Sequence, residues 1–162
     1  MLARFDLPSE LGDTLLADYR AGFPGACSLF PDAARTLSSL RAGGFKLGLI
    51  TNGSVRMQSG KLKCLSLEPA FDTVLISDAE GVSKPHPEIF RRALERLGTM
   101  ADRAVFVGDH PDVDVSGARG AGMKTVWPQD PAVSRTVEAD ATIEELGDLL
   151  HVLGVECHGE DG

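Results

Sequence analysis

The stretch "VFVGDHPDVDVSGARGAGMKTVW", residues 105–127, gives the clearest indication of the fold in this sequence. An apolar run leads through Gly108 into three carboxylates, Asp109, Asp112 and Asp114, and a second apolar run follows after a short helical stretch. This order is typical of a strand, a polar turn, a helix and the next strand. Because a carboxylate that leaves a buried strand needs a partner, the turn predicts a site for a positive charge.

Short apolar stretches alternate with amphipathic ones along the rest of the chain. We expect strands at residues 46–51, 73–77, 104–108 and 123–127, with a short one at 139–143, and helices at residues 9–20, 31–44, 86–98 and 143–153 and directly after Asn52-Gly53-Ser54. This alternation predicts right-handed crossovers, hence an α/β protein with a Rossmann-like, doubly wound parallel sheet.

Three of the expected helices have one apolar face each. These faces are Leu11, Leu15, Leu16 and Tyr19 in the first; Ala34, Leu37 and Leu40 in the second; Ile89, Phe90, Ala93, Leu94 and Leu97 in the helix at 86–98.

Ligands of such sheets bind beyond the carboxyl ends of the strands, so the residues that follow each strand are the candidate site. They are Thr51, Asn52, Gly53, Asp109 and Asp114, joined by Lys84 from the loop before the helix at 86–98. The threonine hydroxyl and the backbone amides of the turn suit phosphate oxygens. Lysine supplies positive charge where negative charge develops, and carboxylates suit a hard cation such as Mg²⁺. The set predicts a phosphoryl-transfer site that lacks a nucleophile.

Several of these residues also have simpler interpretations. Thr51 has the chemistry of a helix cap, and Lys84 that of a solvated surface lysine. Asp114 has a second role open to it, as a cap or ion-pair partner rather than a metal ligand. Asp109 is the hardest to explain without a bound partner.

Composition narrows the classes of partner. The chain has 162 residues, enough for one domain, and a formal net charge of −8 without a basic cluster. We therefore expect no nucleic-acid or membrane partner. A signal-peptide pattern and an apolar run of roughly 20 residues are both missing, which favours a cytoplasmic protein. The three cysteines predict no disulfide framework, and Cys27 and Cys64 are expected to be buried.

Three segments together resemble the haloacid dehalogenase (HAD) superfamily of hydrolases. "LGLITNGS", "VSKPHPEIF" and "VFVGDHPDVDVSGARGAGM" look like its second, third and fourth motifs, in the family's order. The resemblance implies that Thr51 binds the phosphoryl group and that Lys84 orients and charge-balances it. It also implies that Asp109 ligates Mg²⁺ and that Asp114 lies beside the metal or supports Lys84. The metal-dependent phosphatases of the superfamily have this spacing, so the resemblance favours them over its metal-free dehalogenases.

The family's first motif, DxDGT after an apolar strand, is not found in the sequence. "GDTLL" at residues 12–16 imitates its end but lies in the expected helix at 9–20. By resemblance, the missing strand is central, between those ending at Thr51 and Gly108, so two inner strand edges lose their partner. The chain must then close the gap, borrow a strand from another copy, or be unstable. We expect residues 1–28 to be the remnant of a helical cap, 29–152 the HAD-like core and 153–162 a flexible acidic tail.

The leading hypothesis is a Mg²⁺-dependent phosphatase for a small phosphorylated metabolite, in a truncated or start-miscalled form with little activity alone. The alternative is a non-catalytic HAD-like protein that binds Mg²⁺ or a phosphorylated ligand. A phospho-receiver domain also combines a doubly wound sheet with Asp, Thr and Lys. In a receiver, however, the acidic pair comes first and the lysine last, the reverse of the order here. The substrate's identity is beyond the sequence, because most of the cap that selects it is missing.

Overall fold

A computed structural model describes Leu11, residues 14–15, residue 17, residues 27–129 and residues 136–155. The described elements are α2 (Ala33–Ala42), β1 (Gly48–Thr51), α3 (Val55–Cys64), β2 (Thr73–Ile76), α4 (Ser77–Glu80), α5 (Pro87–Leu97), β3 (Val105–Val107), α6 (Ser116–Gly120), β4 (Lys124–Pro128), β5 (Ala141–Ile143) and α7 (Asp148–Val152). Short 3₁₀ turns at Glu68–Ala70 and Ala101–Arg103 and a π-helical turn at Pro111–Val115 join them. The predicted α/β alternation is confirmed.

The strands form two parallel sheets in the described part of the chain. One has the order β1-β2, with Gly48 opposite Thr73 and Thr51 opposite Ile76. The other has the order β3-β4-β5. Strands β1 and β3 are hydrogen-bonded to separate neighbours and not to each other, so each has an edge without a ladder partner among the described strands.

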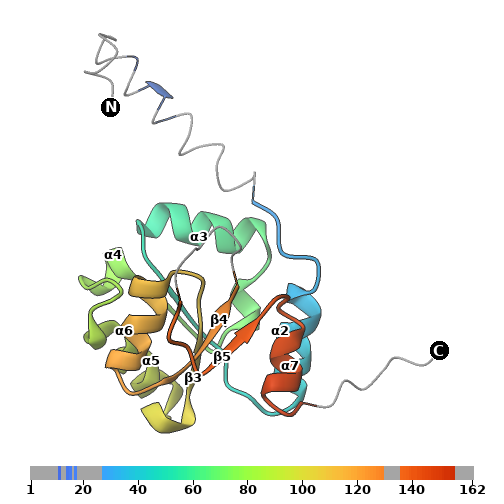
Figure 1. The fold of residues 1–162 in the computed structure, drawn as a ribbon. Helices are drawn as coiled ribbons and strands as arrows, with labels where there is room; N and C mark the ends of the chain where they lie inside the picture. The colour runs from blue at the N-terminus through green and yellow to red at the C-terminus, as the bar shows by residue number, and fades with distance from the viewer. Residues whose placement is uncertain (1–10, 12–13, 16, 18–26, 130–135, 156–162) are drawn as a thin grey trace, which may run out of the picture.

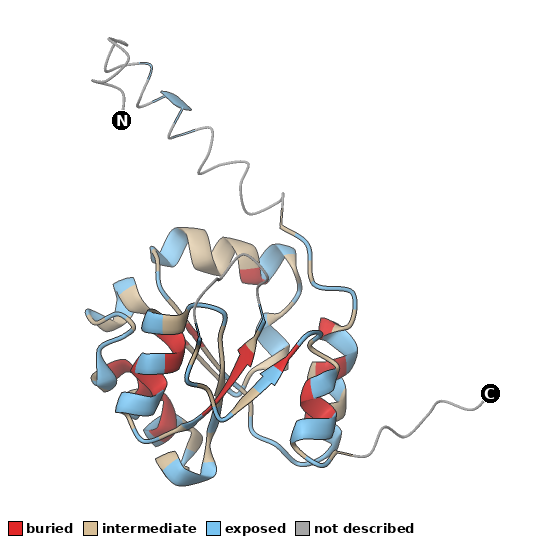
Figure 2. Cartoon of the chain, viewed as in Figure 1, coloured by how far each residue is buried: buried red, intermediate tan, exposed pale blue. Residues whose placement is uncertain are grey.

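Helices cover both faces of the strands, as Figure 1 shows with α5 and α6 on one side and α2 and α7 on the other. Strand β3 contacts both layers because its successive side chains point to opposite faces. Phe106 packs against the first core cluster, Ile50, Leu75, Ile89, Phe90, Ala93 and Ala118. Val107 packs against the second, Leu40, Val126, Ile143, Leu149 and Leu150. Figure 2 shows the buried residues on the helix faces turned toward the strands.

The first core helix is rotated relative to the sequence prediction. The buried residues of α2 are Ala33, Thr36 and Leu40, whereas Ala34 is exposed and Leu37 is half-buried. The threonine tolerates burial because its hydroxyl donates to the carbonyl of Asp32 at 2.9 Å, which satisfies its polar group. The expected face was therefore wrong by one position at two of its three residues.

The last helix is shorter than predicted. Ile143 ends β5, and α7 begins at Asp148. The Asp148 carboxylate accepts the backbone N–H groups of Glu144 and Glu145 at 3.1 and 3.0 Å, so these residues form a turn. Leu153 and Val155 pack against the second core cluster, which takes the packed core past residue 152.

Within the helix expected at residues 9–20, the structure describes four residues. Leu11, Thr14, Leu15 and Ala17 are helical, and Leu11 and Leu15 are 40% and 51% exposed. Leu16 and Tyr19, and most of the expected cap remnant and acidic tail, lie outside the described residues. Within that description, no helix has the length and apolar character to cross a membrane. The expected burial of the cysteines was wrong: Cys64 is exposed and Cys27 is half-buried.

Candidate functional site

Thr51 is the last residue of β1, at the carboxyl edge where the sequence places the site. Its hydroxyl makes no hydrogen bond to the described residues. The cap of α3 is Ser54, whose side chain accepts the N–H of Met57 at 3.4 Å. The helix start therefore does not need Thr51 as a cap, and its hydroxyl remains able to bind a ligand.

Asn52 connects the turn after β1 to the loop that carries Lys84. Its side-chain Nδ2 donates to the Lys84 carbonyl at 2.9 Å, and its Oδ1 accepts the Lys84 N–H at 2.9 Å. The two bonds engage both the backbone N–H and the backbone carbonyl of Lys84. Asn52 thus sets the position of Lys84 relative to Thr51.

Lys84 forms a nearly buried ion pair with Asp114. Its Nζ lies 2.7 Å from Oδ1, with side-chain exposures of 12% for the lysine and 6% for the aspartate. The direction of approach is unfavourable for a hydrogen bond, and Oδ1 has no hydrogen-bond partner among the described residues. Lys84 Nζ also lies 5.4 Å from the centre of the Phe106 ring, within cation–π range. The hypothesis of a solvated surface lysine is therefore wrong.

The π-helical turn Pro111–Val115 brings Asp114 back toward the end of β3. Its Oδ2 accepts the His110 N–H at 3.1 Å. A Cβ on Gly108 would lie 2.5 Å from the Asp114 Cβ, so only glycine leaves room for this side chain. The GDxxxxD spacing therefore places the side chain of Asp114, the second aspartate, against Gly108, the first residue of the motif.

Asp109 is exposed and belongs to the same turn. Its carbonyl accepts the indole N–H of Trp127 at 3.0 Å, which ties the turn to β4. The carboxylate makes neither a hydrogen bond nor an ion pair with the described residues. Asp109 is the site's carboxylate that is open to a ligand from solvent, whereas Asp114 faces Lys84.

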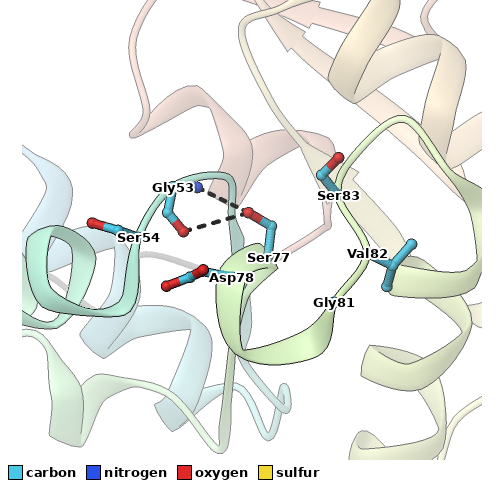
Figure 3. Close-up of a pocket in the computed structure, with 7 residues that line it drawn as sticks. All are labelled: Gly53, Ser54, Ser77, Asp78, Gly81, Val82 and Ser83. Atoms are coloured by element: carbon cyan, nitrogen blue, oxygen red, sulfur yellow. Dashed lines mark hydrogen bonds between the residues drawn. The ribbon is translucent and has the colours of Figure 1, made fainter.

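A shallow pocket of about 310 Å³ lies beside these loops (Figure 3). The Gly53 N–H donates to Ser77 Oγ at 2.9 Å, and Asp78 Oδ2 accepts the Val55 N–H at 3.0 Å. These bonds hold α4 against the start of α3. The lining residues are Gly53, Ser54, Ser77, Asp78, Gly81, Val82 and Ser83.

The loop that leads to Lys84 is anchored at its start by Glu80. The Glu80 carboxylate contacts Arg96 at 2.8 and 3.0 Å and Arg92 at 3.3 Å, and Arg92 also donates to the Glu80 carbonyl at 2.7 Å. Hydrogen bonds from Arg96 and then Arg92 hold the pKa of Glu80 below its usual value. Glu80 and Asn52 therefore fix the two ends of the short segment that carries Lys84.

The structure brings most of the predicted residues into one connected network. Asn52 contacts Lys84, and Lys84 contacts Asp114. Thr51 precedes Asn52 at the end of β1, and Asp109 lies in the turn after β3 that also holds Asp114. Gly53 takes part through its bond to Ser77. Sequence reasoning missed the positioning roles of Asn52 and Glu80, since a side chain that bonds to a distant backbone leaves no local pattern. Among the described residues, no group of three or more His, Cys, Asp or Glu forms a complete metal cage.

The fold is a parallel α/β fold, with a threonine and two aspartates in the loops after β1 and β3 and a lysine, before α5, that contacts one of the aspartates. The family model of the haloacid dehalogenase-like hydrolases matches residues 3–122. The chain belongs to this family, as its three motifs predicted.

Similar proteins support the assignment. Glyceraldehyde 3-phosphate phosphatase from Pyrococcus furiosus is 40% identical over 136 residues, which cover 81% of this chain and 56% of that protein. The structure of a HAD phosphatase from Thermococcus onnurineus is similar at a TM-score of 0.77 and 39% identity, covering 93% of this chain and 66% of that one. The HAD-hydrolase YfnB from Bacillus subtilis, bound to magnesium, has a TM-score of 0.80 at 28% identity, covering 89% and 64%. The chain spans about half the length of the curated relatives it matches.

Proposed function

We propose that this chain provides the phosphoryl- and metal-binding part of a Mg²⁺-dependent phosphatase that acts on a small phosphorylated metabolite in the cytoplasm. The observation that carries the proposal is the contact of the three motif loops: Asn52 holds the Lys84 backbone by two 2.9 Å bonds, and Lys84 lies 2.7 Å from Asp114. The Pyrococcus furiosus relative is a glyceraldehyde 3-phosphate phosphatase, which supports this class of substrate.

In the proposed site, the Thr51 hydroxyl and the N–H groups of Asn52 and Gly53 donate to phosphoryl oxygens. The Gly53 N–H donates to Ser77 Oγ in this structure, so binding must move that hydroxyl. Lys84 balances the negative charge, and its nearly buried position strengthens that interaction relative to bulk water.

The residues present fit part of a Mg²⁺ site. Asp109 offers an exposed, unengaged carboxylate, whereas Asp114 Oδ1 is already ion-paired with Lys84 Nζ at 2.7 Å. Mg²⁺ typically binds one or two carboxylates and takes its other ligands from water and substrate phosphate. We assign Asp109 as the direct ligand, with Asp114 beside it and in contact with Lys84. When bound, the metal would neutralise charge on the phosphoryl oxygens.

The nucleophile is the missing component. The edges of β1 and β3 that lack a partner in the described part of the chain each lie next to a residue of the proposed site, Thr51 and Asp109. We propose that a strand outside this sequence pairs with both edges and carries a carboxylate to the phosphoryl position. Without it, the chain is the non-catalytic phospho-ligand binder of the alternative hypothesis.

A phosphatase assay with p-nitrophenyl phosphate and Mg²⁺ separates these cases. We expect no turnover by the 162-residue chain alone. Addition of a synthetic peptide, an apolar strand followed by Asp-Xaa-Asp-Gly-Thr, should produce Mg²⁺-dependent turnover that Lys84→Ala abolishes.

Two other results would decide against parts of the proposal. Turnover by the chain alone at roughly 1 per second, lost in Lys84→Ala, would show that the nucleophile is already present. Phosphate binding without turnover under either condition would favour the non-catalytic alternative.

A further inference from the structure

The pocket beside the site lies between the two loops that Asn52 holds together. One wall is the turn after Thr51, with Gly53 and Ser54, and the other runs from Ser77 to Ser83, the residue before Lys84. Gly53, whose N–H is assigned to the phosphoryl group, lines this pocket, so a bound phosphate ester has the pocket next to its phosphoryl group. This inference rests on the proposed function.

The chemistry of the lining is polar, with a single negative charge. Asp78 is the charged residue among those that line the pocket, and none of them is basic. Its Oδ2 accepts the Val55 N–H, and no hydrogen bond to the described residues engages Oδ1. The Ser83 hydroxyl likewise makes no hydrogen bond to them. Figure 3 shows the side chains of Asp78 and Ser83 on opposite sides of Ser77.

We propose that this pocket binds the non-phosphoryl end of the substrate and that Asp78 determines its charge class. Hydroxyl or ammonium groups can donate to the Asp78 carboxylate, and a hydroxyl can also exchange a hydrogen bond with Ser83. A second phosphate or a carboxylate on the substrate is repelled by Asp78. The expected substrates are monophosphates with a hydroxylated or amine-bearing end and no second anionic group.

The size of the preference follows from Coulomb's law. A unit charge on the ligand about 4 Å from the Asp78 carboxylate in water changes the affinity by about fivefold, relative to a ligand that is uncharged at that position. Because Asp78 is exposed, salt should weaken the effect.

Amide-resolved NMR titration tests the proposal on the 162-residue chain. Inorganic phosphate, glycerol 3-phosphate, phosphoethanolamine and 3-phosphoglycerate are added separately, and dissociation constants are read from the Gly53 and Ser83 amides. We expect glycerol 3-phosphate to bind about fivefold more tightly than 3-phosphoglycerate, and phosphoethanolamine to bind more tightly still because Asp78 attracts its ammonium group. Asp78→Asn should reduce the ratio between glycerol 3-phosphate and 3-phosphoglycerate to below about twofold, because it removes the charge while its amide oxygen still accepts the Val55 N–H.

Asp148→Asn is the matched control. Like Asp78→Asn, it removes one negative charge from a carboxylate that accepts backbone N–H groups. Because Asp148 lies at the start of α7, away from the pocket lining, the ratio should stay unchanged. Equal binding of all three esters by the wild type, or an unchanged ratio in Asp78→Asn, would overturn the charge selection while leaving the phosphate site intact. Failure of inorganic phosphate to perturb Gly53 would instead overturn the proposed function, and this inference with it.

Discussion

Lys84 and Asp114 form an ion pair whose side chains are 12% and 6% exposed. Such burial costs both groups much of their hydration, and the attraction between them often only offsets this cost. The pair is therefore a poor candidate for a purely stabilising interaction. Its location between two motif loops, with the Lys84 backbone held by Asn52, fits a positioned charge for ligand binding.

Gly108→Ala tests how tightly this pair is packed. The new methyl group would lie 2.5 Å from the Asp114 Cβ and 2.8 Å from its Oδ2, so the aspartate must move. Overpacking of this kind typically costs about 1–3 kcal/mol, and we expect that loss in the free energy of unfolding by urea titration. Gly120→Ala is the control, since its Cβ would have no atom within 4 Å. Equal stability of the two variants would contradict the packing described for Asp114.

At the scale of elements, Glu80 joins α4 to α5 and thereby holds the loop before Lys84. Because Arg96 and Arg92 lower its pKa in the folded protein, the charged carboxylate stabilises the fold above the pKa of the unfolded chain. That stability is lost as the pH falls through the folded value. Glu80→Gln should therefore be less stable than wild type at pH 7, and the difference should shrink below about pH 4.3.

Urea unfolding at several pH values measures this difference. Glu95→Gln is the control, because Glu95 forms an exposed surface pair with Arg91 on the same helix, and such pairs contribute little. A Glu80→Gln difference that stays constant with pH would show that the carboxylate's charge does not hold α4.

The elements were largely predictable because each strand has a short apolar run and the helix at 86–98 has a clear periodicity, whereas α4 (Ser77–Glu80) was not predicted. Helix α5 begins at Pro87 and ends before Gly98, as its sequence signals indicate. The less accurate predictions depended on tertiary contacts: the buried Thr36 and the turn fixed by Asp148. The candidate site residues came from their positions at strand ends, whereas the Asn52 and Glu80 anchors required the three-dimensional structure.

At the level of the whole molecule, the edges of β1 and β3 that have no ladder partner among the described strands predict self-association. Unpaired edges are templates for strands of other chains. We expect the mass measured by analytical ultracentrifugation to rise with concentration above the 17.2 kDa of one chain. Val105→Glu should reduce the rise in mass, because a charge on an edge strand disfavours pairing with another chain. Within the sheet, the new carboxylate lies opposite Lys124, which is a favourable neighbour.

Val55→Glu is the matched control for this substitution. Val105 and Val55 are similarly exposed, at 38% and 42%, but Val55 is the first residue of α3 and lies outside the strands. A wild-type chain that stays monomeric at high concentration, or a control that suppresses association equally, would contradict pairing through β3.

We propose that the loops after β1 and β3 form one phosphate and Mg²⁺ site. An NMR titration with inorganic phosphate, with and without about 10 mM Mg²⁺, tests this. We predict shifts at the Thr51 and Gly53 amides and tighter phosphate binding with Mg²⁺. Mg²⁺ alone should stabilise the chain by only about 0.4 kcal/mol, as for a Kd near 10 mM.

Asp109→Asn should remove the effect of Mg²⁺ while phosphate still binds, and Asp102→Asn, an exposed carboxylate in a 3₁₀ turn, should change neither. Phosphate shifts away from residues 51–53, or a Mg²⁺ effect that survives Asp109→Asn, would contradict the claim.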